Sequence, residues 1–172
     1  MVPKPCKLPR VFAGSSAEGL EVVRIVQAEL DYDAEVSIWT ANFQPSRDSL
    51  SQLVEAAWNS DFGLFALTPD DKLESRGKSH LSPRDNVIFE LGLFFGAVGQ
   101  SRTFLITPRG GPGLKLPTDL LGITPLDYDI QKIDLRAALG PACHKMRQII
   151  RELGILDRRL PPDAQGLLPP QH

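Results

Sequence analysis

The stretch SPRDNVIFELGLFFGAVG, residues 82–99, decides the fold, because it predicts a largely buried helix. Ser82 is a candidate N-cap, Pro83 suits the first helical position, and Asp85 follows the cap at capping-box spacing. Apolar residues then recur at helical spacing and form one broad stripe: Val87, Ile88, Leu91, Phe94, Phe95 and Val98. Phe89 and Leu93 continue the apolar character onto the opposite face of the helix, so we expect the helix to be buried on most sides.

Glu90 is the one acid among these apolar residues, near the edge of the stripe and one turn after Asn86. A glutamate is seldom fully buried unless it is paired or used. Two interpretations are open at this point. Glu90 is either a rim residue that reaches water or an arginine such as Arg84, or a functional carboxylate.

Length and composition are those of one ordinary globular domain. The chain has 172 residues, of which 42% are hydrophobic and 23% charged. A net charge of -2 gives no support to binding of a nucleic-acid polymer. The N-terminus has no signal-peptide core, and the longest apolar run is too short to span a bilayer. We therefore expect a cytoplasmic chain without a membrane segment, and we expect no metal, since Cys6 and Cys143 lack ligand spacing.

Strand-like and helix-like patterns alternate along the chain. Strands are expected at residues 10–14, 36–40, 62–67, 103–107 and 123–128, the last at an edge because of Pro125. Helices are expected from Ser15 as cap to about residue 30, after residue 48, and at residues 83–98 and 142–153. In the second of these helices the expected inward face is Leu50, Leu53, Val54, Ala57 and Trp58.

This alternation predicts an α/β fold with a five-stranded parallel sheet and helices on both faces. Five strands favour the flavodoxin-like order 2-1-3-4-5, with a ligand crevice at the carboxyl ends of strands 1 and 3. Residues 68–81 read as a long polar loop. We divide the chain into a lead-in at 1–9, a domain at 10–154 and a proline-rich linker or tail at 155–172.

Three segments converge on the predicted crevice. Gly14, Ser15 and Ser16 follow strand 1 and suit either a phosphate or a simple helix-capping turn. Residues from Thr40 to Phe43 follow strand 2, which ends in Trp39 and Thr40. The rings of Trp39 and Phe43 can stack on a flat ligand, although Trp39 is equally well explained as a core residue. Asp70, with Asp71, follows strand 3 and is either a metal ligand or solvated. Neither a GxGxxG motif nor a P-loop is present.

A single glutamate beside such a turn suits cleavage of an N-glycosidic bond to a positively charged leaving group. The transition state resembles an oxocarbenium ion, which a carboxylate in an apolar pocket stabilises. The leaving group departs neutral, so no general acid is needed. One carboxylate is therefore enough.

Four stretches taken in order resemble the bacterial TIR-like domains of cyclic-nucleotide-activated antiphage effectors. They are VFAGSSAEGLEVV, DFGLFALTPDD, SPRDNVIFELGLFFGAVG and LPTDLLGITPLDYD, and the match spans about residues 10–130. The NVIFELG block is the specific part of the resemblance. Such domains occur fused to STING or SAVED sensors or to membrane segments.

The resemblance implies a TIR fold and hydrolysis of NAD⁺ to nicotinamide and ADP-ribose, with NAD⁺ as substrate and no cofactor. The family's catalytic glutamate falls on Glu90, the loop after the first strand on Gly14, Ser15 and Ser16, and the BB loop on residues 41–48. Many TIR NADases have an aromatic residue one turn before the glutamate, where this chain has Asn86, so the ring contact is expected from Trp39 or Phe43. Members are usually activated by self-association through a linked sensor domain.

The expected substrate-binding residues are those that border the crevice: Gly14, Ser15, Ser16, Trp39, Thr40, Phe43, Asp70, Arg84 and Asn86. Two alternatives to an NAD⁺ glycohydrolase remain. A nucleoside deoxyribosyltransferase also places a glutamate in a flavodoxin-like crevice. A non-catalytic TIR scaffold would act only by assembly through residues 45–48.

Overall fold

The computed structural model describes residues 7–39, 49–75, 78–111, 113–117, 120 and 125–159. A five-stranded sheet forms its centre, with all strands parallel and in the order β2-β1-β3-β6-β7. The strands are β1 (Arg10–Ser15), β2 (Glu35–Trp39), β3 (Phe62–Ala66), β6 (Thr103–Arg109) and β7 (Leu126–Asp129). This arrangement confirms the predicted flavodoxin-like order, with the fifth strand of the sheet at an edge.

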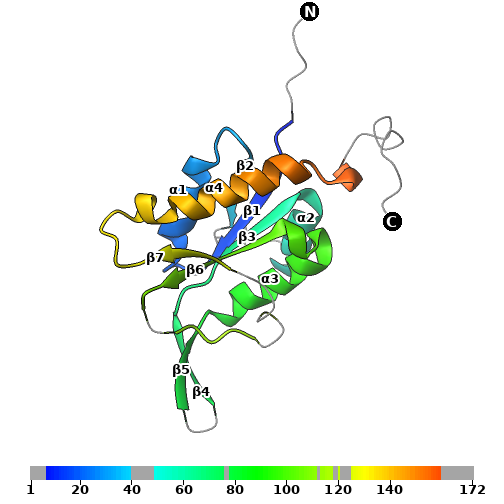
Figure 1. Ribbon diagram of the computed structural model, residues 1–172. Coiled ribbons are helices and arrows are strands. Elements are labelled where there is room, and N and C mark those ends of the chain that lie inside the picture. The colour runs from blue at the N-terminus through cyan, green and yellow to red at the C-terminus, as the bar shows by residue number, and fades with distance from the viewer. Residues whose placement is uncertain are drawn as a thin grey trace, which may run out of the picture.

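Helices cover both faces of the sheet, as predicted (Figure 1). On one face α1 (Leu20–Glu29) and α4 (Leu135–Leu153) pack over one hydrophobic cluster, and on the other α2 (Ser49–Asn59) and α3 (Asp85–Val98) pack over a second. Alternation along β1 divides its side chains between them: Val11 and Ala13 enter the first cluster and Phe12 the second. Every residue of central β3 is buried, as its continuous apolar character predicts.

The prediction of a long loop at residues 68–81 is wrong. The structure has an antiparallel hairpin there, β4 (Asp71–Ser75) paired with β5 (Lys78–Ser82), which projects from the carboxyl end of the sheet (Figure 1). The hairpin escapes a periodicity search because Leu73 and Leu81 are the only apolar residues in its two strands. Its base is held by backbone pairing, with the Lys115 amide donating to the Leu81 carbonyl at 2.7 Å.

Three helix starts also differ from the expectations. The N-cap of α3 is Arg84 without a side-chain cap, since Ser82 ends β5 instead of capping the helix. Helix α1 begins at Leu20 after Gly19, so Ser15 is not its cap. Helix α4 begins at Leu135, seven residues before the expected start. Asp134 caps it by accepting from the amides of Arg136 and Ala137, and Pro141, which reads as a breaker, lies inside the helix.

Two expected apolar faces are only partly buried. In α2, Leu53 and Ala57 are buried, whereas Leu50 and Trp58 are exposed. In α3, Val87, Leu91, Phe94 and Val98 are buried, as the stripe predicts. Phe89 is 58% exposed, so the expectation that α3 is buried on most sides is wrong. Among the described elements none packs over Gly92 and Gly96 on this face of α3, where an added Cβ would meet nothing within 4 Å.

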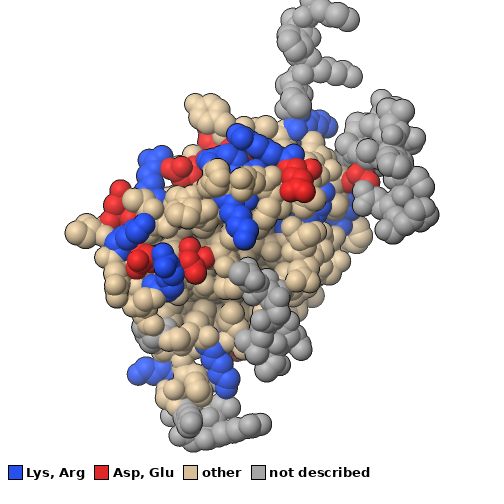
Figure 2. Space-filling view, in the orientation of Figure 1, with Lys and Arg blue, Asp and Glu red and all other residues tan. Residues whose placement is uncertain are grey.

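Residues just after α4 pack against the end of the sheet opposite the hairpin. Arg158 donates to the carbonyls of Ala97, Ala57 and Ser60. The Leu156 amide donates to buried Asp61 at 2.9 Å. On the face shown in Figure 2, cations and anions are interspersed over α4 and α1 and not segregated into one basic field. Among the described residues no helix is long and apolar enough to cross a membrane.

Candidate active site

The carboxylate of Glu90 lies over the carboxyl end of β1. It lies close to Gly14, since a Cβ added at Gly14 would be 3.0 Å from Glu90 Oε2 and 2.9 Å from the Phe65 ring. A side chain at this position would therefore displace either the carboxylate or the ring. Phe65 belongs to β3, so the acid stands where β1 and β3 adjoin, at the crevice that the strand order predicts.

Trp39 approaches the same carboxylate from the edge strand. It is the register partner of Gly14 in the parallel β1–β2 pair, and its indole N–H donates a hydrogen bond to Glu90. Its ring lies 5.6 Å from that of Phe12, which in turn stacks on Phe94 of α3 at 4.4 Å. The aromatic contacts thus join β2, β1 and α3 directly beneath the acid.

Burial raises the pKa of Glu90 from 4.5 to about 7, and the hydrogen bond from Trp39 acts in the opposite direction. No arginine or lysine of the described residues forms an ion pair with Glu90. Arg84, one of the two partners left open by the sequence, instead pairs with Glu18 at 3.1 Å on the surface. The interpretation of Glu90 as a rim residue held by Arg84 is therefore wrong.

Two contacts tie the loop after β1 to neighbouring elements. The Ser16 hydroxyl lies 3.0 Å from that of Thr68, after β3, and accepts a hydrogen bond from the Gly19 amide at 3.3 Å. Glu18 reaches Arg84 at the start of α3. The Ser15 hydroxyl is buried without a hydrogen-bond partner among the described residues. This loop is therefore fixed against both the second crevice strand and the helix that carries Glu90.

The remaining expected site residues are more scattered. Asp70 lies at the base of the hairpin, where its amide donates to the carbonyls of Thr68 and Ser82; its Oδ2 is buried without a hydrogen-bond partner among the described residues. Burial of Tyr128 in β7 raises the pKa of its hydroxyl, and the nearby charge of Asp70 raises it further. Asn86 is exposed in the first turn of α3. Thr40, Phe43 and the rest of residues 40–48 lie outside the described residues.

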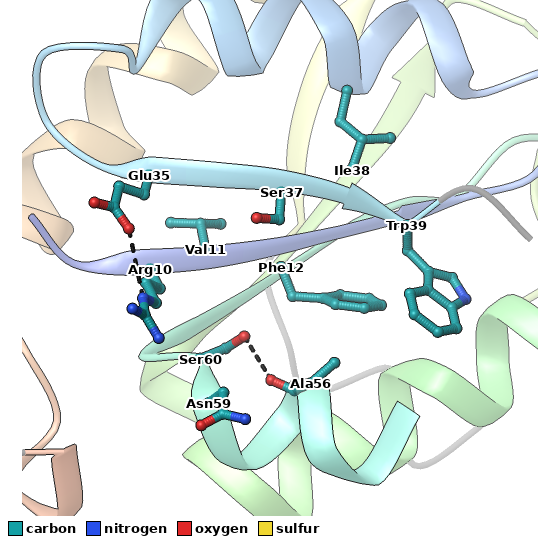
Figure 3. Close-up of a pocket in the computed structure, with 10 residues that line it drawn as sticks. All are labelled: Arg10, Val11, Phe12, Glu35, Ser37, Ile38, Trp39, Ala56, Asn59 and Ser60. Atoms are coloured by element: carbon teal, nitrogen blue, oxygen red, sulfur yellow. Dashed lines mark hydrogen bonds and ion pairs between the residues drawn. The ribbon is translucent and has the colours of Figure 1, made fainter. Parts of the chain in front are cut away.

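A groove that the sequence did not indicate runs beside Trp39, between the sheet and α2 (Figure 3). Its volume is about 460 Å³. One end carries the Arg10–Glu35 ion pair at 3.4 Å, and the other carries the rings of Phe12 and Trp39. Alternation along β2 gives the only sequence signal for it, since Glu35, Ser37 and Trp39 share one face of an edge strand. Within the described part of the chain no group of three or more His, Cys, Asp or Glu residues could hold a metal ion.

Comparison with known proteins places the chain in a family. The sequence model of the CAP12/Pycsar effector protein TIR domain matches residues 10–130. The Pycsar effector protein PaPycTIR of Pseudomonas aeruginosa is 40% identical over 148 residues, which are 84% of this chain and 48% of that protein. The CD-NTase-associated protein 12 of Flavobacterium daejeonense is 38% identical over 161 residues, 93% of this chain and 49% of that protein.

The chain spans about half the length of these curated relatives. Among solved structures, a flavodoxin-like domain from a Synechococcus protein superposes with a TM-score of 0.44 at 12% identity, covering 83% of this chain and 96% of that domain. The match of the family model to most of the chain agrees with the resemblance carried by the NVIFELG block. This chain belongs to the family of CAP12/Pycsar effector TIR domains.

Proposed function

We propose that this chain is an NAD⁺ glycohydrolase that cleaves the bond between nicotinamide and ribose, with Glu90 as the catalytic residue. The observation that carries the proposal is the state of Glu90: partly buried, at the carboxyl end of β1, and without an ion-pair partner among the described residues. A carboxylate that is not neutralised by the protein is available to a positive charge on the substrate.

The chemistry requires stabilisation of a cationic sugar. As the C1′–N bond breaks, its electron pair goes to the pyridinium ring, which leaves as neutral nicotinamide, and positive charge develops on the ribose. Ionised Glu90 stabilises this charge, and its weakly screened surroundings strengthen the attraction. Water then adds to C1′ and loses a proton, which gives ADP-ribose; a carboxylate with a pKa of about 7 is suited to accept that proton.

Gly14 and the loop after it are suited to bind the substrate. Because Gly14 has no side chain, Glu90 Oε2 can lie directly over the end of β1, at the crevice to which the reacting sugar carbon must come. The adjoining loop, fixed through Ser16 to Thr68, presents the end of β1 and the start of α1 to the same crevice. We assign the phosphates of NAD⁺ to this loop, and we keep Ser15, Asp70, Arg84 and Asn86 as candidates for the remaining contacts.

Family membership supports a proposal for the wider role of this activity. We propose that the chain acts as the NAD⁺-depleting effector of a cyclic-nucleotide-activated antiphage pathway in the cytoplasm. In this proposal a linked sensor domain of STING or SAVED type drives self-association, which switches on hydrolysis. A domain that is weakly active alone would spare the NAD⁺ of an uninfected cell.

The test is chromatographic measurement of nicotinamide released from NAD⁺ at increasing protein concentration. Release that depends on concentration, and that Glu90→Gln abolishes while the variant keeps its fold, supports the proposal. Undiminished release by Glu90→Gln refutes the catalytic assignment. Specific activity that is constant over a wide concentration range refutes activation by self-association.

The same measurements separate the two alternatives. Exchange of free bases on deoxynucleosides, with NAD⁺ untouched, would identify a nucleoside deoxyribosyltransferase. Self-association unaffected by Glu90→Gln, with no turnover of either substrate, would identify a non-catalytic scaffold.

A further inference from the structure

Trp39 is placed to act on Glu90, and not only on the substrate as an expected stacking ring. It ends the edge strand β2 directly opposite Gly14, and the absent side chain of Gly14 is what lets the indole and the carboxylate meet across β1. The N–H of the indole donates to Glu90. No other side-chain hydrogen bond to this carboxylate is recorded among the residues that the structure describes.

The Trp39 ring packs against other aromatic side chains. Phe12 contacts it at 5.6 Å between centroids, and Phe12 is itself packed against Phe65 and Phe94. The ring also lines one end of the groove of about 460 Å³ between the sheet and α2 (Figure 3). The hydrogen bond to Glu90 adds a directional contact to this packing and contributes to the orientation of the ring.

We infer that Trp39 is a positioning residue for the proposed hydrolysis: its indole N–H holds the Glu90 carboxylate in place above Gly14. The same hydrogen bond favours the ionised form of the carboxylate. A donor to one carboxylate oxygen leaves the other oxygen for the sugar cation. It also restricts rotation of a side chain that is otherwise surrounded by apolar groups, which keeps the charge at the reacting carbon. The kinetic consequences of this inference rest on the proposed function, whereas the contact between Trp39 and Glu90 does not.

The direct test uses the indole N–H signals in nitrogen-15 NMR spectra, which need no substrate. The chain has two tryptophans, so two such signals are expected, and Trp58→Phe assigns them while leaving Trp39 intact. Trp58 lies on the exposed side of α2 with Arg158 over its ring, and it serves as an internal control. The Trp39 signal should move with pH with a midpoint near the Glu90 pKa of about 7, and this movement should vanish in Glu90→Gln.

The kinetic test compares Trp39→Phe with Trp58→Phe. Phenylalanine keeps an aromatic ring but has no N–H, so the pKa of Glu90 should rise by about one unit, and the acid limb of kcat/KM should move to higher pH by the same amount. At pH 6 this is a loss of about tenfold that shrinks as the pH is raised. KM for NAD⁺ should change little, and Trp58→Phe should behave as wild type.

The outcomes are distinct for each idea. A Trp39 signal that is insensitive to pH between 5 and 9 overturns the inference, whatever the kinetics. A Trp39→Phe variant with raised KM and an unmoved acid limb also overturns it, because that result identifies a stacking contact with the substrate. A Trp39 signal that titrates in a protein without any NAD⁺ turnover upholds the contact and refutes the proposed function instead.

Discussion

Replacement of Glu90 by glutamine should remove catalysis and yet make the protein more stable at neutral and alkaline pH. The folded-state pKa of about 7 lies above the ordinary value of 4.5 because burial penalises the charged form. The folded protein therefore holds this proton more tightly than the unfolded chain does. Wild-type stability is fully present below pH 4.5 and falls as the pH rises through 7, whereas glutamine does not titrate.

The magnitude follows from the pKa difference. Raising the pKa from 4.5 to about 7 corresponds to about 3 kcal/mol at full effect. Because the Glu90 side chain is partly exposed, solvent screening reduces this to about 2 kcal/mol. For a domain of this size, about 2 kcal/mol raises Tm by roughly 4–8 °C. Glutamine keeps the shape of the side chain and an oxygen that accepts from Trp39, so packing changes little.

Thermal and urea unfolding of both proteins between pH 4.5 and 8.5 checks this expectation. The curves should coincide near pH 4.5 and separate in favour of Glu90→Gln through pH 7. Glu152→Gln, at an exposed glutamate of α4, controls for the loss of one acid. A stability difference that does not vary with pH, or a variant less stable than wild type at pH 8, would refute the reasoning.

Three further predictions concern the surroundings of the site. Gly14→Ala should lower nicotinamide release at least tenfold and the free energy of unfolding by about 1–3 kcal/mol, because the new Cβ would press on Glu90 and Phe65. The matched control is Gly96→Ala, in an open helical position, whose free energy of unfolding should rise by up to about 1 kcal/mol. If Arg84 contacts the substrate, Arg84→Ala should raise KM for NAD⁺ severalfold, whereas Glu18→Ala, which breaks the same ion pair, should leave KM unchanged. Equal changes of KM in Michaelis–Menten assays of the two variants would show that only the ion pair matters. Arg158→Ala should cost about 2 kcal/mol in urea unfolding, because three helix-end carbonyls lose a charged donor, against little change for exposed Arg24→Ala; a matching loss in both would contradict this.

The sheet and its order follow from the sequence because each parallel strand has a strong local signal. Phe62–Ala66 is apolar throughout, and only a central strand covered on both faces buries such a run. The stripe of Val87, Leu91, Phe94 and Val98 likewise has one interpretation at helical spacing. These signals rest on burial, which is the dominant favourable contribution to folding, and so they survive tertiary context.

The differences arise where burial is slight. The β4–β5 hairpin has polar strands held by backbone pairing, so no side-chain period marks it. The expected helix at 142–153 starts too late, because α4 continues through Pro141: Leu139, Ala142 and Cys143 on either side of it are buried in one cluster. Phe89 appears buried by composition, but whether a helix face is covered depends on the neighbouring elements, which the local sequence does not encode.

The candidate site, like the fold, can be predicted from the sequence only in part. Glu90 is identifiable from the sequence because an acid within an apolar helix needs an explanation, and Gly14 because it ends the first strand. The contact between them requires the register, which pairs Gly14 with Trp39 on one side and with Phe65 on the other. Sequence reasoning placed Trp39 in the crevice but assigned its ring to the ligand, since the direction of an indole N–H depends on packing around it.

The register also explains why three residues so far apart in the chain form one unit. In a parallel sheet, neighbouring positions on adjacent strands point to the same face, so Gly14, Trp39 and Phe65 all face α3. Two of the three positions carry rings that exclude water from Glu90, and the third carries nothing, which leaves space for the carboxylate. Burial without a countercharge destabilises the folded state at neutral pH, and the proposed substrate supplies the missing positive charge. The destabilisation and the catalytic capacity therefore have one physical origin, so a variant that relieves the first should lose the second.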